Sequence, residues 1–398
     1  MEIIMASKEV VIVSYSRTPI GSFGGELSSV PATNLGAEAI KGSIAKINLP
    51  TDSVDQVIMG NVLSAGLGQA PARQASFKAG LSEDVPAVTL NKMCGSGLKS
   101  VIYAHDQVKA GTSDLVAAGG MESMTNAPYL APKMRSGAKV GHQQMYDHMF
   151  LDGLEDVYDP GRLMGTFAED TAELFQFTRE QQDEYALGSL QNALEAQKNN
   201  AFDKEIAPVT IKTRKGEHTI SEDEQPKNAQ PEKIPNLRPA FRKDGTVTAA
   251  NSSSISDGAA ALIISSEDKA SELSLQVRAK ILGHTVHAQK PGLFTTAPIP
   301  AAKKLLKNIG WSSEEVDLWE VNEAFAVVPM GFMKELNIPR EKINVNGGAC
   351  ALGHPIGASG ARILVTLLNA LEKRALRKGV AAICLGGGEG LAIAIERP

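Results

Sequence analysis

Cys94 stands in a sequence context that favours a reactive thiol. The apolar run Ala87 to Leu90 predicts a buried strand, and apolar residues near helical spacing predict a helix from about Ser96 to Lys109. Cys94 falls in the short turn between them, beside Gly95 and Gly97. Small residues let a ligand approach the backbone, and a helix start offers free N–H groups and the positive end of a dipole. A buried packing cysteine is the alternative, but the strand–turn–helix setting favours a nucleophile with a lowered thiol pKa.

His354 is the residue whose surroundings suit a general base. It lies between Gly353 and Gly357, just before a predicted helix, and Pro355 stiffens the turn. A structural histidine is the more common use of this residue type. A rigid, glycine-flanked turn nevertheless fixes an imidazole in space, as proton transfer requires.

Two further residues stand where predicted strands end. Cys384 closes a strand at the turn 386–388, and the run 391–395 leaves as a second strand. Such a glycine turn exposes N–H groups that could stabilise an oxyanion, although a buried cysteine beside a hairpin is the plainer interpretation. Asn322 stands at another change from strand to helix, where it could equally be a helix N-cap.

The elements that carry these residues repeat along the chain. A strand opening at Asp55 precedes Cys94 by 39 residues, and a strand opening at Asp317 precedes His354 by 37 residues. Each turn contains a Gly/Ser element and leads into a long helix with an apolar face. Two similar α/β halves indicate a duplication, with the active site where the halves meet.

A segment of different character separates the halves. The run 115–118 predicts a short strand ending at Gly119-Gly120, and from Met121 the chain is rich in Met, Asp, Gln and Pro. One long helix is predicted there, over 179–198, and regular alternation resumes at 259–265. The predicted division is an N-terminal half, 1–120 completed by 250–275, an inserted loop domain, 121–249, and a C-terminal half, 276–398.

Four motifs in this order resemble the thiolase family, and the resemblance covers nearly the whole chain. The motifs are Asn-x-x-Cys-x-Ser-Gly at 91–97, Asn-Glu-Ala-Phe at 322–325, Gly-His-Pro-x-Gly-x-Ser-Gly at 353–360 and Cys-x-Gly-Gly-Gly-x-Gly at 384–390. The family implies an α/β fold in which two duplicated halves form a five-layer αβαβα core, with an inserted loop domain.

The resemblance also implies roles for the motif residues. Cys94 would be the acylated nucleophile, His354 would take its proton, and Cys384 would be the acid/base of the second half-reaction. His354 and a water held by Asn322 would form one oxyanion site. The backbone N–H groups of Cys94 and Gly386 would form the other.

The resemblance is less specific for the residues that contact the substrate than for the catalytic residues. Ser253 resembles the residue that contacts pantetheine, and Arg214 the basic residue that meets the phosphates or adenine of coenzyme A, although an exposed Arg is usually a solvated charge. Leu154 and Met164 would cover the pantetheine and acyl group. Bulky Met164 and Phe325 favour a short acyl pocket.

Two positions depart from the family pattern. Leu163 stands where short-chain members often carry His, which puts that contact with coenzyme A in doubt. Glu389 stands where Met or Gln is common, and the sequence offers no reason for it.

The expected reaction is the reversible condensation of two acetyl-CoA to acetoacetyl-CoA and CoA, through an acetyl thioester on Cys94. CoA thioesters are substrates, and we expect no cofactor and no metal. A degradative 3-ketoacyl-CoA thiolase of broader chain length is the alternative within enzymes. A catalytically inactive lipid-binding relative is the alternative from another class. Cys384 argues against a decarboxylating condensing enzyme and against a Cys-His hydrolase.

Composition narrows the remaining possibilities. A chain of 398 residues suggests two or three domains, and a net charge of -5 argues against a nucleic-acid partner. No run of about 18 apolar residues predicts a membrane span. Three cysteines without a Cys-x-x-Cys pair predict neither a disulfide scaffold nor a zinc knuckle.

Location and assembly are also expectations. The first ten residues do not resemble a targeting leader, and the last three, 396–398, do not resemble a peroxisomal address, so we expect a cytosolic protein. The Met-rich stretch 121–150 is long for a surface loop. With the family resemblance it predicts a homo-oligomer, a tetramer before a dimer.

Overall fold

The computed structural model describes residues 8–214 and 216–398. Most of the first ten residues, from which we predict the absence of a targeting leader, lie outside this range. A ten-stranded mixed sheet of order β12-β13-β14-β11-β1-β10-β5-β3-β4, with β2 beside β10, forms its centre. The first half of the sequence supplies β1 (Val10–Arg17), β2 (Gly21–Ser22), α1 (Ala32–Ala45), β3 (Gln56–Gly60), α2 (Pro71–Lys78), β4 (Ala87–Leu90), α3 (Ser96–Ala110), β5 (Leu115–Ser123), and later β10 (Ser256–Ser266) and α7 (Glu267–Glu272).

The C-terminal half repeats this arrangement. It supplies β11 (Ala279–Ala288), η4 (Pro291–Thr296), α8 (Pro298–Ile309), β12 (Leu318–Val321), α9 (Val327–Leu336), η5 (Arg340–Lys342), α10 (Ala349–Leu352), α11 (Ile356–Lys373), β13 (Lys378–Leu385) and β14 (Glu389–Glu396). The strand order β11-β14-β13-β12 corresponds to β1-β10-β5-β3, and β1 pairs with β11 where the halves join. The predicted duplication is confirmed.

The aspartates that marked the repeat have the same role in both halves. Asp55 accepts hydrogen bonds from the N–H groups of residues 114 and 115, at 2.6 and 2.9 Å. Asp317 accepts them from residues 377 and 378, at 2.9 and 2.8 Å. Each carboxylate therefore ties the start of one strand to the start of its parallel neighbour.

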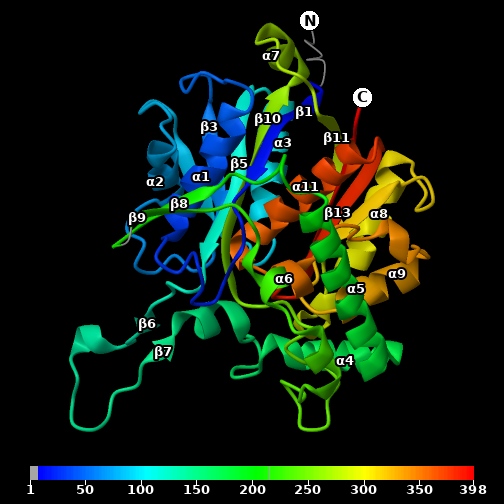
Figure 1. Cartoon of the computed structure of the whole chain (residues 1–398). Helices are drawn as coiled ribbons and strands as arrows, with labels where there is room; N and C mark the ends of the chain where they lie inside the picture. The colour runs from blue at the N-terminus through cyan, green and yellow to red at the C-terminus, as the bar shows by residue number, and fades with distance from the viewer. Residues whose placement is uncertain (1–7, 215) are drawn as a thin grey trace, which may run out of the picture.

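Side-chain alternation along the strands builds five layers. In β1, Val10 and Ile12 face a core shared with α3 and α11, whereas Val11 and Val13 face α1 and α2. In β14, Ile393 faces the shared core, and its neighbours face α8 and α9. Helices α3 and α11 thus form the middle layer between two sheet halves, and Figure 1 shows α11 running through the centre of the molecule. The predicted fold class is confirmed.

Part of the segment between β5 and β10, with β6, β7 and α4, covers one end of this core, whereas its strands β8 and β9 lie beside α1 (Figure 1). It contains β6 (Tyr129–Leu130), η1 (Met134–Ser136), β7 (Tyr146–Asp147), η2 (Phe150–Leu154), α4 (Met164–Phe175), α5 (Arg179–Lys198), β8 (Val209–Thr213), β9 (Gly216–Ile220), α6 (Glu224–Asn228) and η3 (Pro231–Asn236). The predicted helix over 179–198 is confirmed as α5. In the described part of the chain, no helix is long and apolar enough to cross a membrane.

One predicted boundary is wrong. The strand expected to end at Gly119-Gly120 continues through both glycines to Ser123. A Cβ atom on Gly119 would lie 2.0 Å from the Ala260 carbonyl oxygen, and one on Gly120 would lie 2.1 Å from that of Gly357. These glycines are required by close backbone packing, not by a turn.

Candidate active site

Cys94 lies in a braced turn between β4 and α3. Met93 has a φ of 48°, the left-handed region that a side chain rarely adopts. The Ser96 hydroxyl accepts a hydrogen bond from the Lys92 N–H at 2.8 Å and donates one to the Met93 carbonyl at 2.6 Å. These bonds hold the turn in its unusual conformation and fix the half-buried Cys94.

The thiol of Cys94 does not have the lowered pKa that the helix start led us to expect. Burial raises the pKa of Cys94 to about 11, with a further contribution from Glu122, although the N–H groups of Cys94 and Gly386 act in the opposite direction. Removal of water therefore outweighs the two N–H groups. At neutral pH the resting residue is a neutral thiol.

The β13–β14 hairpin packs directly against this turn. A Cβ atom on Gly95 would lie 2.8 Å from Leu385, so the two segments are in close contact. The Gly386 N–H interacts favourably with the Cys94 thiolate, which places it where the predicted oxyanion site requires a donor. Cys384 is fully buried, and its pKa is raised by burial and by the nearby Cys94. The structure thus brings both thiols and Gly386 together.

Glu389, whose role could not be predicted, forms an ion pair with Lys92. Lys92 belongs to the Cys94 turn and Glu389 to the first position of β14, and both side chains are partly buried, at 24% and 30% exposure. The pair therefore joins the nucleophile turn to the hairpin that carries Gly386.

The turn before α11 positions His354. Its Nδ1 lies 2.6 Å from the Ser359 hydroxyl, which itself donates to the Pro355 carbonyl at 3.0 Å. Because the serine proton is used in that bond, Nδ1 carries the hydrogen and Nε2 presents a lone pair. Burial and the positive charge of Arg362 lower the pKa of His354 to about 3, so the imidazole is neutral at neutral pH.

Two glycine contacts bring the turns of the two halves to one place. A Cβ atom on Gly97 of α3 would lie 2.7 Å from the Ala361 nitrogen of α11. One on Gly360 of α11 would lie 2.4 Å from the Leu98 nitrogen of α3. The glycines that follow each turn therefore let the two helix starts approach with their backbones in contact.

Asn322 is buried beside this site. Its N–H donates to the Ala382 carbonyl at 3.0 Å, two residues before Cys384. Within the described residues, neither end of the Asn322 side-chain amide has a hydrogen-bond partner, and neither has Nε2 of His354. Buried polar atoms without partners are rare in proteins, so both groups are suited to bind a ligand or water.

Two residues that organise the site are not among the predicted site residues. Ser359 orients the imidazole of His354, and the Ser of the quoted Gly-x-Ser-Gly element was the available signal. The second is Glu323, whose buried carboxylate accepts hydrogen bonds from Tyr185, Ser189 and the Cys350 N–H at 2.7 to 3.0 Å. Its neighbour Asn322 is thereby held in position.

Four of the five predicted substrate contacts line the same region. Leu154 packs in an apolar cluster with Cys94, and the Met164 sulfur would lie 3.9 Å from a Cβ atom on Gly386. Phe325 belongs to the apolar core that contains Cys384, and Ser253 donates to the Ala324 carbonyl beside it at 3.0 Å.

Arg214 is the exception. It lies in the exposed turn between β8 and β9, and in Figure 1 this hairpin lies on the side of α1 and α2, away from α4. Arg214 therefore does not lie with the other four predicted substrate contacts. The placement of a hairpin within the insertion depends on long-range packing, which a local sequence match does not specify.

Comparisons with known proteins cover both halves of the chain. The family model for the thiolase N-terminal domain matches residues 10–268, and that for the thiolase C-terminal domain matches residues 275–397. A Schizosaccharomyces pombe relative named acetyl-CoA acetyltransferase is 47% identical over 99% of this chain and 100% of its own. An Allochromatium vinosum relative of the same name is 46% identical over 98% of this chain and 100% of its own.

Solved structures are similar as well. The Bacillus anthracis acetyl-CoA acetyltransferase has a TM-score of 0.96 at 41% identity, covering 99% of this chain and 100% of that one. Acat5 thiolase from Ascaris suum, solved with coenzyme A, has a TM-score of 0.92 at 44% identity, covering 98% and 100%. The chain belongs to the thiolase family.

Proposed function

We propose that this protein is an acetyl-CoA C-acetyltransferase that condenses two acetyl-CoA to acetoacetyl-CoA and CoA, reversibly. The observation that carries the proposal is the pairing of Cys94 with a second, fully buried thiol, Cys384, beside the Gly386 N–H. A single acyl transfer needs one thiol. A second thiol with a raised pKa is a strong base once it is deprotonated, as removal of an α-proton requires. The names of the relatives support the same activity.

The first half-reaction would acylate Cys94. As its sulfur attacks the acetyl carbonyl, His354 Nε2 accepts the thiol proton, and the N–H groups of Cys94 and Gly386 stabilise the oxyanion. The departing CoA sulfur takes a proton from Cys384, which leaves Cys384 as a thiolate. A neutral thiol and a neutral imidazole are the resting states that this sequence of proton transfers needs.

The second half-reaction would form the carbon–carbon bond. Cys384 removes an α-proton from the second acetyl-CoA, and His354 with a water on Asn322 stabilises the enolate oxygen. The α-carbon attacks the acetyl carbonyl, the Cys94 sulfur leaves, and it recovers the proton held by His354. Atoms and charges balance over the cycle.

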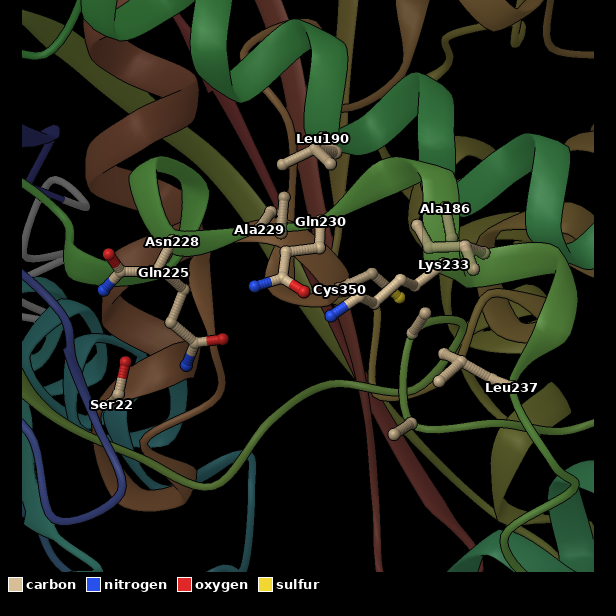
Figure 2. Close-up of a pocket in the computed structure, with 14 residues that line it drawn as sticks. Ser22, Ala186, Leu190, Gln225, Asn228, Ala229, Gln230, Lys233, Leu237 and Cys350 are labelled. Carbon is tan, nitrogen blue, oxygen red and sulfur yellow. The ribbon is translucent and has the colours of Figure 1, made fainter.

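A pocket of about 420 Å³ provides a candidate site for the nucleotide end of coenzyme A (Figure 2). Leu237, Ala249 and Ala250 contribute apolar wall, and Lys233 contributes a cation. Ala250, which lines the pocket, precedes Ser253 by three residues in the sequence. We therefore propose Lys233, in place of Arg214, as the basic residue that meets the phosphates.

Thioesters of different length test this assignment. Lys233→Ala should raise the KM for acetyl-CoA about tenfold or more, since a charged hydrogen bond is worth about 1.5–3 kcal/mol. It should leave the KM for acetyl-N-acetylcysteamine, which has no nucleotide, unchanged. Arg214→Ala is the matched control. The assignment to Lys233 is wrong if Arg214→Ala shows the selective effect instead.

Two measurements test the activity itself. Mixing with acetyl-CoA should add one acetyl mass to the peptide that contains Cys94, and an unmodified peptide would favour an inactive lipid-binding relative. Steady-state thiolysis should favour acetoacetyl-CoA over longer 3-ketoacyl-CoAs, because Met164 and Phe325 narrow the acyl end. Equal rates for long chains would instead indicate a degradative 3-ketoacyl-CoA thiolase.

We also propose a homo-oligomer, a tetramer before a dimer. The β6–β7 segment projects from the body of the molecule in Figure 1, and it exposes Tyr129, Met145 and Tyr146 at 63%, 66% and 43%. Exposed apolar side chains on a projecting segment suit a contact between copies. Light scattering at micromolar concentration should give at least a dimer, and a stable monomer would contradict the proposal. A cytosolic location stays a prediction, to be tested by cell fractionation.

A further inference from the structure

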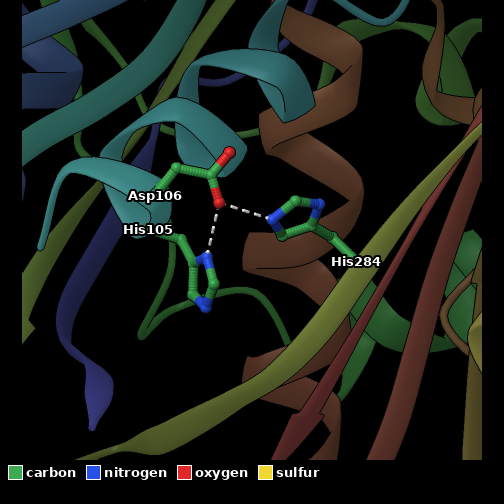
Figure 3. A group of neighbouring side chains, drawn as sticks. All are labelled: His105, Asp106 and His284. Atoms are coloured by element: carbon green, nitrogen blue, oxygen red, sulfur yellow. Dashed lines mark hydrogen bonds and ion pairs between the residues drawn. The ribbon is translucent and has the colours of Figure 1, made fainter. Parts of the chain in front are cut away.

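A compact group of metal-binding side chain types lies outside the acyl-transfer site. His105 and Asp106 come from the C-terminal part of α3, and His284 comes from β11 (Figure 3). One potential ligand atom from each residue lies within 4.8 Å of the other two. The group therefore joins an element of the N-terminal half to one of the C-terminal half.

Both imidazoles face the same carboxylate oxygen. Nδ1 of His105 lies 3.0 Å from Oδ1 of Asp106, and Nε2 of His284 lies 2.8 Å from the same atom. The two rings meet edge to face, with centroids 4.9 Å apart. Three potential ligand atoms thus gather in one place, with both imidazole nitrogens directed at Oδ1 of Asp106.

The spacing is close to that of a coordinated set. Ligands about 2.0 Å from a tetrahedral zinc ion lie about 3.3 Å from each other. The two nitrogens would need to move only a few tenths of an ångström away from the oxygen to reach this separation. Both elements that carry them are regular secondary structure, so the geometry is already held by the fold.

Exposure and nearby charge decide how a cation reaches the group. Lys99 and Lys109 are nearby cations and reduce the local negative potential. The side chain of Asp106 is 49% exposed, so an ion and its completing waters can enter from that side.

We propose that His105, Asp106 and His284 bind one divalent transition-metal ion of the zinc type. Two imidazoles and one carboxylate favour zinc, cobalt or nickel over magnesium and calcium, which prefer sets made of oxygen alone. The site takes no part in the proposed acyl transfer. Its effect is to tie α3, whose first turn follows Cys94, to the C-terminal half.

Cobalt and zinc titrations of the full-length protein test the proposal. Co²⁺ should bind with one ion per chain and give a d–d absorption without the near-ultraviolet thiolate band that a cysteine ligand produces, and Zn²⁺ should displace it. Either metal should raise the Tm, since it binds the folded state selectively. Mg²⁺ should do neither.

Variants identify the ligands. His284→Ala and the near-isosteric Asp106→Asn should each weaken Co²⁺ binding at least about tenfold, with the rate of acetyl-enzyme formation unchanged. His287→Ala, three residues along β11 and outside the cluster, is the matched control. Three outcomes would overturn the proposal: no binding of either metal at micromolar concentration, a thiolate band, or unchanged affinity in both ligand variants.

Discussion

The turn before α3 and the turn before α11 occupy equivalent places in the two halves, yet each uses its serine differently. Ser96 bonds to backbone atoms of Lys92 and Met93, the two residues before Cys94, so it braces the main chain. Ser359 bonds to a side chain, the imidazole of His354, and so fixes a tautomer. One duplicated scaffold thus supplies a nucleophile from one half and a base from the other. The difference shows that duplication conserved the position of the turn, while its chemistry diverged.

The two thiols of the site give the sharpest contrast between the halves. Cys384→Ala should still accept acetyl from acetyl-CoA on Cys94, but more slowly, because the departing CoA loses its proton donor. It should lose synthesis of acetoacetyl-CoA by about 100- to 10,000-fold, because no base removes the α-proton of the second acetyl-CoA. Exchange of that proton, followed by NMR in deuterated water, measures the step directly. Exchange at the wild-type rate would remove Cys384 from this role.

Cys94→Ser supplies the reciprocal control for that experiment. It should abolish acetyl-enzyme formation, because the reactive sulfur is gone. Cys350→Ser changes the third thiol, which lines the proposed nucleotide pocket and not the acyl-transfer site, so Cys94 should still be acetylated. If Cys94→Ser is still labelled by acetyl-CoA, the nucleophile lies elsewhere.

The raised thiol pKa predicts a steep pH dependence of alkylation. With a Cys94 pKa of about 11, the thiolate fraction grows tenfold for each pH unit, so iodoacetamide should react about 100-fold faster at pH 9 than at pH 7. Mass spectrometry of the Cys94 peptide measures this rate. Free cysteine, with an ordinary pKa of about 8.5, should level off within the same range. A plateau for Cys94 below pH 8 would show that the helix start outweighs burial.

Replacing the two equivalent serines should separate their roles. Ser359→Ala should slow acetyl-enzyme formation about fivefold, the value of one hydrogen bond of about 1 kcal/mol, with little change in stability. Ser96→Ala should instead lower the free energy of unfolding by about 1–2 kcal/mol, since two backbone groups lose a partner. Stopped-flow acetylation and urea unfolding give the two quantities. Equal losses of stability in both variants would contradict the assignment.

The paired aspartates should affect stability alone. Asp55→Ala and Asp317→Ala each remove an acceptor from two backbone N–H groups and should lower the free energy of unfolding by about 1–2 kcal/mol. Similar losses of unfolding free energy would show that the two aspartates stabilise their halves equally, as well as occupying equivalent positions. Asp52→Ala, at an exposed position in the same loop as Asp55, is the control. Losses that differ by more than about 1 kcal/mol would show that one half depends on its aspartate more than the other.

Much of the fold could be predicted from local patterns. The helix over 179–198 has a capping box at Thr178 and Gln181, so local forces specify it. Strand β4 forms over the predicted run, but its predicted burial is wrong. It is an edge strand with no buried residue, and Val88 is 42% exposed. The wrong prediction that a strand ends at Gly119-Gly120 has its cause in long-range packing. A glycine required for close packing and a glycine required for a turn have the same letter, and only the neighbouring backbones of β10 and α11 distinguish them.

The candidate site divides in the same way. Its motif residues could be chosen from the sequence because each follows a strand at a turn rich in small residues, where α/β folds place their chemistry. The sequence could not give the pKa of Cys94, because the desolvation of a thiol depends on everything packed around it. It could not give a partner for Glu389 either, since Lys92 is 297 residues away along the chain.

The sequence by itself determined the duplicated architecture, the order of the motifs and the residues able to react, because periodicity and glycine placement act over a few residues. The tertiary structure decided the rest: that Cys94, Cys384 and Gly386 meet, that Ser359 sets the tautomer of His354, and that Arg214 lies apart from them. It also brought His105, Asp106 and His284 together. The physical reason is that desolvation, hydrogen-bond geometry and electrostatic pairing depend on distances through space, and these exist only once the two halves have packed.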